Sequence, residues 1–180
     1  ESSLKNYLAM RAGNGRKMPY LAVIHRLDQP VEGVLVFGKT PKAAKALSAQ
    51  ITAGKMEKIY LAVTYGQPDI RACEMENGDN EDGSKLVVLE DYLKKDGRTN
   101  TSAVVNAGTP GAKRARLSYK VLGEAVDKIS GKKKWLLRIH LDTGRHHQIR
   151  VQMAHAGMPL AGDRKYGAAG NVTIGAGNLA

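Results

Sequence analysis

The stretch HRLDQPVEGVLVFGKTPKAAKALSAQITAG, residues 25–54, places a turn, a β-rich run and a helix start in direct succession. The run Val34–Phe37 consists of strand-forming residues and ends at Gly38, which predicts a short strand. Thr40 then supplies an N-cap side chain, and Pro41 is favourable at the first helical position. A helix is therefore expected directly after the strand.

The residues after Pro41 have helical periodicity. Ala44, Leu47 and Ile51 fall on one helical face, and Gly54 is suited to end the helix in a left-handed conformation. This pattern predicts an amphipathic helix that packs on a sheet.

Further along the chain, strand and helix patterns alternate, and no internal repeat divides them. Strands are expected at 59–65, 117–122 and 135–141, with a turn at Ser130-Gly131 joining the last two into a long hairpin. A helix is expected after Asp142-Thr143-Gly144, with Ile149, Met153 and Ala156 on one face and Gly157 and Pro159 as its stop signals. Residues 74–85 have the composition of a solvated acidic loop, and the glycine-rich segment from Gly167 to Ala180 that of a surface tail.

The composition indicates one globular domain, residues 1–180, whose partner is a polyanion. Hydrophobic residues make up 42% of the 180-residue chain, enough for a core. The net charge of +11 and the pI near 9.8 favour nucleic acid, although a merely soluble basic protein has the same charge. Cys73 is the single cysteine, and no apolar run is long enough to cross a bilayer, so a cytoplasmic setting without a membrane partner is expected.

The predicted hairpin has a basic end, formed by Lys128, Lys132, Lys133 and Lys134. These lysines are suited to contact RNA phosphates in a salt-dependent way. An equally good explanation is a charged hairpin end that keeps the protein soluble.

Two clusters have candidate chemistry. Asp28 follows His25-Arg26-Leu27 in a turn between ordered elements, where loops commonly present functional side chains. Its spacing alone favours the simpler role of hydrogen-bonding its own turn. The second cluster, Thr143–Arg150, contains a glycine turn and a helix start, so that Arg145 and backbone N–H groups can receive a phosphate. The alternative is a charged first turn without a ligand.

The other common chemistries lack their sequence patterns. The spacing of the histidines does not match a zinc helix, and HExxH is absent from the sequence, so no metal site is expected. The sequence also has no G-x-S-x-G elbow, and Cys73 lies beside acidic residues that disfavour a thiolate.

Three segments together resemble the RluA-type pseudouridine synthases, which modify uridines in ribosomal and transfer RNA. They are HRLDQPVEGVLVFGKT at 25–40, KIYLAVTYG at 58–66 and TGRHHQIRVQMAHAGMPLAGDRKYG at 143–167. The segments are specific and follow the order of the family. The resemblance implies an α+β pseudouridine synthase fold with a central mixed, largely antiparallel sheet flanked by helices.

The resemblance also implies roles for individual residues. Asp28 is then the catalytic aspartate, Tyr60 the tyrosine against the target base, and Arg150 the basic partner of the aspartate. Three further positions are expected to bind substrate in addition to Arg145. Arg26 resembles an arginine that enters the RNA helix, Ile149 packs under the tyrosine ring, and Lys58 matches the family pattern without a defined role.

The implied reaction is the isomerisation of specific uridines in structured rRNA or tRNA. Because uridine and pseudouridine are isomers, neither a redox cofactor nor an energy source is expected, and no obligatory protein partner is implied. The base has to be flipped out of the RNA stack to reach Asp28, whose charged form a nearby guanidinium favours.

Two departures from the family pattern leave an alternative open. Val31-Glu32 precede Gly33 where the family usually has a small polar pair, and family strands expected at both ends are missing, so the chain is expected to be incomplete at both ends. An RNA-binding or folding-assistance protein that lost catalysis is the second hypothesis. A metal-dependent hydrolase that uses the histidines is a distant third.

Overall fold

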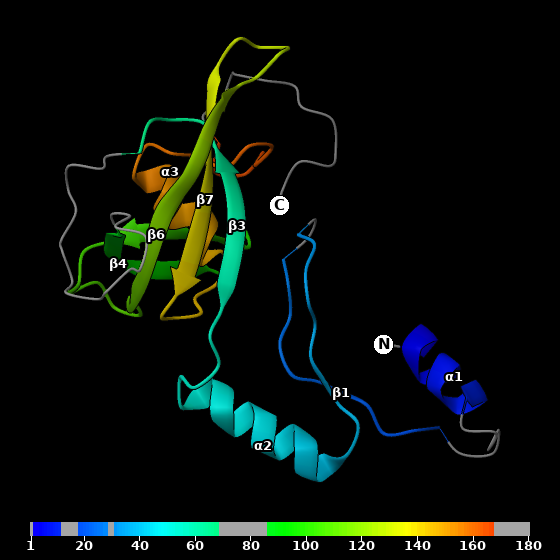
Figure 1. Ribbon diagram of the computed structural model, residues 1–180. Coiled ribbons are helices and arrows are strands. Elements are labelled where there is room, and N and C mark those ends of the chain that lie inside the picture. The colour runs from blue at the N-terminus through cyan, green and yellow to red at the C-terminus, as the bar shows by residue number, and fades with distance from the viewer. Residues whose placement is uncertain (1, 12–17, 29–30, 69–85, 168–180) are drawn as a thin grey trace. The chain divides into compact units, whose positions relative to one another are not determined.

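The computed structural model describes residues 2–11, 18–28, 31–68 and 86–167 (Figure 1). The chain divides into two compact units, Glu1–Met56 and Glu57–Ala180. The predicted acidic loop at 74–85 lies outside the described residues, and so does the predicted tail except for its first residue, Gly167. The single domain over 1–180 stays a prediction.

The first unit contains helix α1 (Ser2–Arg11), a two-stranded antiparallel ribbon of β1 (Ala22–Val23) and β2 (Phe37–Gly38), and helix α2 (Pro41–Thr52). The N-cap prediction for α2 is confirmed, because Thr40 Oγ1 accepts a hydrogen bond from the Ala43 N–H at 3.1 Å. Gly54 follows the helix at φ +67°, the left-handed conformation that was expected.

The apolar face predicted for α2 is present, but the strand predicted before it is shorter than expected. Ala44, Leu47 and Ile51 of α2 are half-buried, which confirms the predicted apolar face. The strand predicted at Val34–Phe37 is wrong for its first three residues, because only Phe37 belongs to β2 and Val34 is 81% exposed. A strand needs a paired neighbour as well as β-forming residues, and β1 offers only two residues to pair with.

The second unit is built on a five-stranded sheet in the order β3-β7-β6-β4-β5, with every neighbouring pair antiparallel (Figure 1). This sheet, with helix α3 packed against it, confirms the expected α+β class. The strands are β3 (Ile59–Thr64), β4 (Val87–Asp96), β5 (Thr101–Val105), β6 (Lys113–Val126) and β7 (Lys133–Leu141), and the helix is α3 (Gln148–His155).

The core lies between the sheet and α3. Leu117, Leu137 and Ile139 of the central strands are fully buried, as is Met153 of the helix. The alternation predicted for β3 is confirmed, since the face that includes Ala62 is buried whereas Ile59 and Leu61 on the other face are about half exposed. The predicted β6–β7 hairpin is also present.

The end of β3 contacts the end of α3 through a close backbone approach. Gly66 has φ +104°, and a Cβ atom there would lie 2.1 Å from the carbonyl oxygen of Gly157. Tyr65 N–H and Ala161 N–H extend this junction by donating to Pro159 and Val63 carbonyls at 3.0 and 2.8 Å. A residue without a side chain is therefore required at position 66.

Candidate active site

Asp28 belongs to the first unit. Its carbonyl oxygen accepts from the Val31 N–H at 2.8 Å, and its side chain is exposed, as is that of Arg26. The loop is closed across its base, where the Val36 N–H donates to His25 Nε2 at 3.3 Å. His25 thus has a structural role that the sequence patterns did not reveal, because it binds the segment that leads into β2.

Tyr60 and Ile149 belong to the second unit and border the same core. Tyr60 lies on β3 opposite Ile139 and on the sheet face that packs toward α3, whereas Ile149 lies in the first turn of α3. Both side chains are half-buried against the main hydrophobic cluster. An aromatic ring and an aliphatic side chain are therefore held at the edge of a packed core, where each keeps an accessible part.

Arg150 forms a buried, two-pronged ion pair with Asp163. Its Nε and Nη2 donate to the two carboxylate oxygens, each at 2.8 Å, and the Asp163 side chain is only 1% exposed. Burial raises the pKa of Asp163, but hydrogen bonds from Arg150 and from the Lys165 and Tyr166 N–H groups outweigh it, so the pKa is below its ordinary value. The pair therefore holds the guanidinium in one orientation.

Behind this pair, Tyr166 connects to two stacked histidines. The Arg150 guanidinium lies over the Tyr166 ring, 5.0 Å from its centroid. The Tyr166 hydroxyl accepts from the Ser102 N–H and meets His147 Nδ1, both at 2.8 Å. His146 and His147 stack at 3.7 Å between ring centroids, and His146 Nδ1 is 2.9 Å from Ser102 Oγ. Strand β5 thus supports the Arg150 region, a link for which the sequence had no signal because β5 was not predicted.

Lys58 lies close to the turn that precedes α3. Burial lowers the pKa of its ammonium group, Asp142 opposes that shift, and Arg145 adds to it. The Lys58 backbone accepts from the Leu141 N–H at 2.9 Å, which ties the start of β3 to the end of β7. Both Asp142 and Arg145 are therefore close enough to Lys58 to act on its charge.

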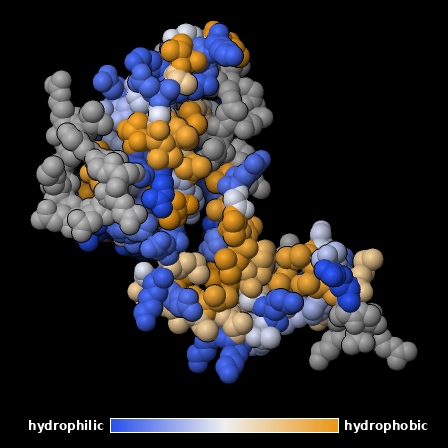
Figure 2. Space-filling view, viewed as in Figure 1, coloured by the Kyte–Doolittle hydropathy of each residue, from blue (hydrophilic) through white to orange (hydrophobic). Residues whose placement is uncertain are grey.

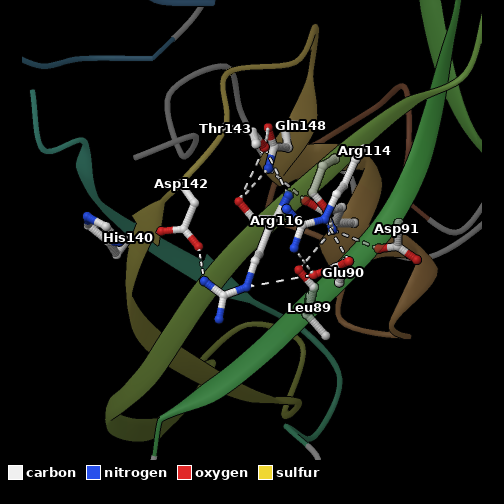
Figure 3. Close-up of polar contacts among 11 residues, drawn as sticks. Leu89, Glu90, Asp91, Arg114, Arg116, His140, Asp142, Thr143 and Gln148 are labelled. Carbon is white, nitrogen blue, oxygen red and sulfur yellow. Dashed lines mark hydrogen bonds and ion pairs between the residues drawn. The ribbon is translucent and has the colours of Figure 1, made fainter. Parts of the chain in front are cut away.

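Asp142 is also part of a charged ladder across the sheet (Figure 3). Its carboxylate pairs with Arg116 Nη1 and lies 3.1 Å from His140 Nδ1. Arg116 Nε is 3.7 Å from Glu90, which accepts two hydrogen bonds from Arg114 at 2.6 and 2.7 Å. Arg145 Nε donates to the Arg114 carbonyl at 2.8 Å. The ladder contains more cations than carboxylates.

Two buried glutamines connect α3 to the sheet, and the sequence patterns missed both. Gln148 accepts from the Thr143 hydroxyl at 2.8 Å (Figure 3). It also accepts from the Arg145 N–H at 2.9 Å, and its amide donates to Gln152. Gln152 is fully buried and donates to Asp91 at 2.8 Å. The spacing of four residues places both amides on one helix face, which was the available signal.

The structure brings some predicted site residues together and leaves others untested. The second unit contains five of them: Lys58, Tyr60, Arg145, Ile149 and Arg150. Arg26 and Asp28 belong to the first unit, so the predicted pairing of Asp28 with Arg150 stays a prediction. Among the described residues, no group of three or more His, Cys, Asp or Glu side chains is arranged to hold a metal ion. None of the described helices has the length and apolarity to cross a membrane.

Comparison with known proteins identifies the family. The model of the family described as RNA pseudouridylate synthase matches residues 1–155, which include the turn of Asp28, the strand of Tyr60 and the helix of Arg150. This chain therefore belongs to the RNA pseudouridylate synthase family.

Curated relatives agree with the RluA-type resemblance. An uncharacterized RNA pseudouridine synthase of Chloroflexus aurantiacus is 34% identical over 146 residues, covering 81% of this chain and 38% of that protein. Ribosomal large subunit pseudouridine synthase D of Xanthomonas campestris is 32% identical over 176 residues, covering 98% of this chain and 46% of that protein. The chain thus spans less than half the length of these relatives.

Solved structures support the fold. Human RNA pseudouridylate synthase domain containing 1 has a TM-score of 0.68 at 23% identity, covering 92% of this chain and 60% of that one. Human RNA pseudouridylate synthase domain containing 4 has a TM-score of 0.69 at 20% identity, covering 96% and 62%. The fold expected from the sequence is confirmed.

Proposed function

We propose that this chain catalyses the isomerisation of uridine to pseudouridine in RNA, with Asp28 as the nucleophile. The main support is the family match, which spans Asp28, Tyr60 and Arg150 in one alignment over 1–155. The net charge of +11 is consistent with an RNA substrate. The ribosomal name of one relative favours rRNA, with tRNA as the other candidate.

The reaction requires three events, and each has a candidate residue. The bond between uracil N1 and the sugar C1′ breaks, the base turns, and a bond between C5 and C1′ forms while C5 loses a proton and N1 gains one. Ionised Asp28 attacks either C1′ or C6 of the ring, and the bond that it forms breaks again when the product is released. Tyr60 stacks on the uracil, and its hydroxyl or a water removes the C5 proton.

Arg150 keeps Asp28 ionised in this proposal. Nε and Nη2 of Arg150 bind Asp163, which fixes the direction of the guanidinium. The proposal assigns its remaining N–H groups to the ionised carboxylate of Asp28. A preoriented cation stabilises the carboxylate without reorganising during the reaction. The base reaches this site only after flipping out of the RNA, at a cost on the order of a few kcal/mol.

The proposal also assigns RNA-binding roles to four residues around the reacting nucleotide. Arg26, exposed two residues before Asp28, occupies the position left by the flipped base. Lys58 and Arg145, which lie within electrostatic reach of each other, bind RNA phosphates next to the reacting nucleotide. Ile149 supports the tyrosine ring from below.

The test is Asp28→Asn, which preserves shape and removes the nucleophile. We expect loss of tritium release from RNA labelled at uridine C5, with RNA binding retained. Asp96→Asn is the matched control, since it changes an exposed carboxylate at the end of β4 that has no role in the proposed site. Release at the wild-type rate by Asp28→Asn would exclude Asp28 as the nucleophile. Ribosomal and transfer RNA from a strain that lacks the gene serve as substrates and identify the missing pseudouridines.

A further inference from the structure

The hairpin that joins β6 and β7 extends beyond the rest of the sheet. Strand β3 ends where Thr64 pairs with Trp135. Strands β6 and β7 stay paired with each other beyond this point, as far as the pair Val126 and Lys133 (Figure 1). Beyond that point the described part of the sheet has only these two strands. The hairpin end, residues 124–134, is therefore a projecting two-stranded ribbon.

Asp127 gives the turn of this ribbon a defined shape. Its Oδ1 accepts from the Ile129 N–H at 3.0 Å and from the Ser130 N–H and hydroxyl at 2.8 and 3.0 Å. Its backbone exchanges hydrogen bonds with Lys132 and Gly131, both at 2.8 Å. The salt bridge to Lys134 and the turn N–H groups hold the pKa of Asp127 well below its usual range.

The charges at the hairpin end are not balanced. Lys134 pairs with Asp127, and Lys133 pairs with Glu124 at 3.1 Å. Lys128 and Lys132 are exposed and form no ion pair with a described residue. The two carboxylates are thus used within the ribbon, and a net positive charge remains at its tip.

An apolar side chain stands between these two lysines. Ile129 is 97% exposed, the most exposed large hydrophobic side chain of the described residues. Figure 2 shows the hairpin end, at the top of the view, as mainly hydrophilic with hydrophobic atoms among the charged ones. Single exposed hydrophobics are common on protein surfaces, but this one is held at a projecting turn that its neighbours make basic.

We propose that this hairpin end is an RNA-binding element, in which Lys128 and Lys132 contact phosphates and Ile129 packs against an unstacked base. The proposal rests on the proposed function, because the partner is the RNA substrate outside the reacting nucleotide. Charge complementarity selects a polyanion, and an isolated aliphatic side chain between cations matches the wedges that proteins insert beside bases. Since unpaired RNA offers exposed base faces, the preferred partner is a stem–loop.

The predicted phosphate contacts of Lys128 and Lys132 are tested by fluorescence anisotropy with a fluorescein-labelled RNA stem–loop. We expect Lys128→Ala/Lys132→Ala to weaken binding and to reduce the slope of log affinity against log salt by about 1.5, as two lost phosphate contacts require. Lys94→Ala/Lys95→Ala on β4 removes the same charge from exposed positions and serves as the control. Equal affinities and slopes for the two double variants would overturn the proposal.

The predicted contact of Ile129 with an unstacked base is tested with Ile129→Ser, whose binding to the stem–loop is compared with its binding to a blunt RNA duplex. We expect about tenfold weaker stem–loop binding, an unchanged salt slope and little effect on the duplex. Unchanged binding to both RNAs would overturn the assignment of Ile129 to an unstacked base. The binding comparison is read by anisotropy and does not depend on tritium release. A failure of catalysis thus leaves the binding comparison intact, and the two proposals are tested separately.

Discussion

At the scale of single residues, Arg150 shows how a site residue depends on partners that are distant in sequence. The motif at 143–167 includes Arg150 and Asp163, thirteen positions apart, but nothing in the spacing predicts that the two pair. Their two hydrogen bonds of 2.8 Å form because the chain turns back after α3. A buried guanidinium needs such a counter-charge to remain in place.

We predict that Asp163→Asn lowers the free energy of unfolding by about 3–5 kcal/mol at pH 7, because it leaves Arg150 buried without its counter-charge. The folded-state pKa of Asp163 lies below the unfolded value near 3.9. The pair therefore stabilises the fold above about pH 4, and this stability is lost as the pH falls through the folded pKa.

Urea unfolding at pH 7 and under acid conditions measures this effect, with the fluorescence of the single tryptophan, Trp135 on β7, as the reporter of the second unit. The difference between wild type and variant should shrink on acidification. Glu124→Gln, which breaks an exposed pair with Lys133, should change stability little. A constant difference across the pH range would show that the loss is steric and not electrostatic.

At the scale of elements, the junction between β3 and α3 positions the proposed tyrosine relative to the helix of Arg150. Gly66 ends the motif that contains Tyr60, and Gly157 follows Ala156, the C-cap of α3. Their backbones approach so closely that no side chain fits at position 66. The sequence shows a glycine there but not the carbonyl that it faces.

Gly66→Ala should therefore destabilise the second unit by about 1–3 kcal/mol through overpacking, with a further cost from φ +104°. The urea midpoint followed by Trp135 fluorescence measures the loss. Gly97→Ala is the control, since its added Cβ meets no atom within 4 Å and its φ is not in the left-handed region. Similar midpoints for both variants would show that the junction tolerates a side chain by moving.

At the scale of the whole molecule, the dominant property is positive charge. The chain has 28 Lys and Arg residues and 17 Asp and Glu residues, so release of counterions from RNA should drive much of its binding.

We predict that the affinity for the RNA stem–loop falls steeply with salt, by at least about tenfold between 50 and 200 mM KCl. Titration by fluorescence anisotropy measures the slope. Sucrose at matched osmolality should leave the affinity nearly unchanged, which separates charge screening from osmotic effects. An affinity that is insensitive to KCl would contradict phosphate-driven association.

The sequence by itself determined the family, the α+β class, the N-cap at Thr40, the hairpin and the helix at the second motif, because each depends on local patterns or on motif order. It did not predict β4 and β5, which lack a distinctive pattern, and it overestimated the strand at Val34–Phe37, since pairing depends on a distant partner.

Only the tertiary structure decided that Asp163 holds Arg150, that Gln148 and Gln152 connect α3 to the sheet, and that Gly66 meets Gly157. These contacts join residues whose proximity arises only when the sheet and helix pack, and side-chain type alone does not encode that geometry.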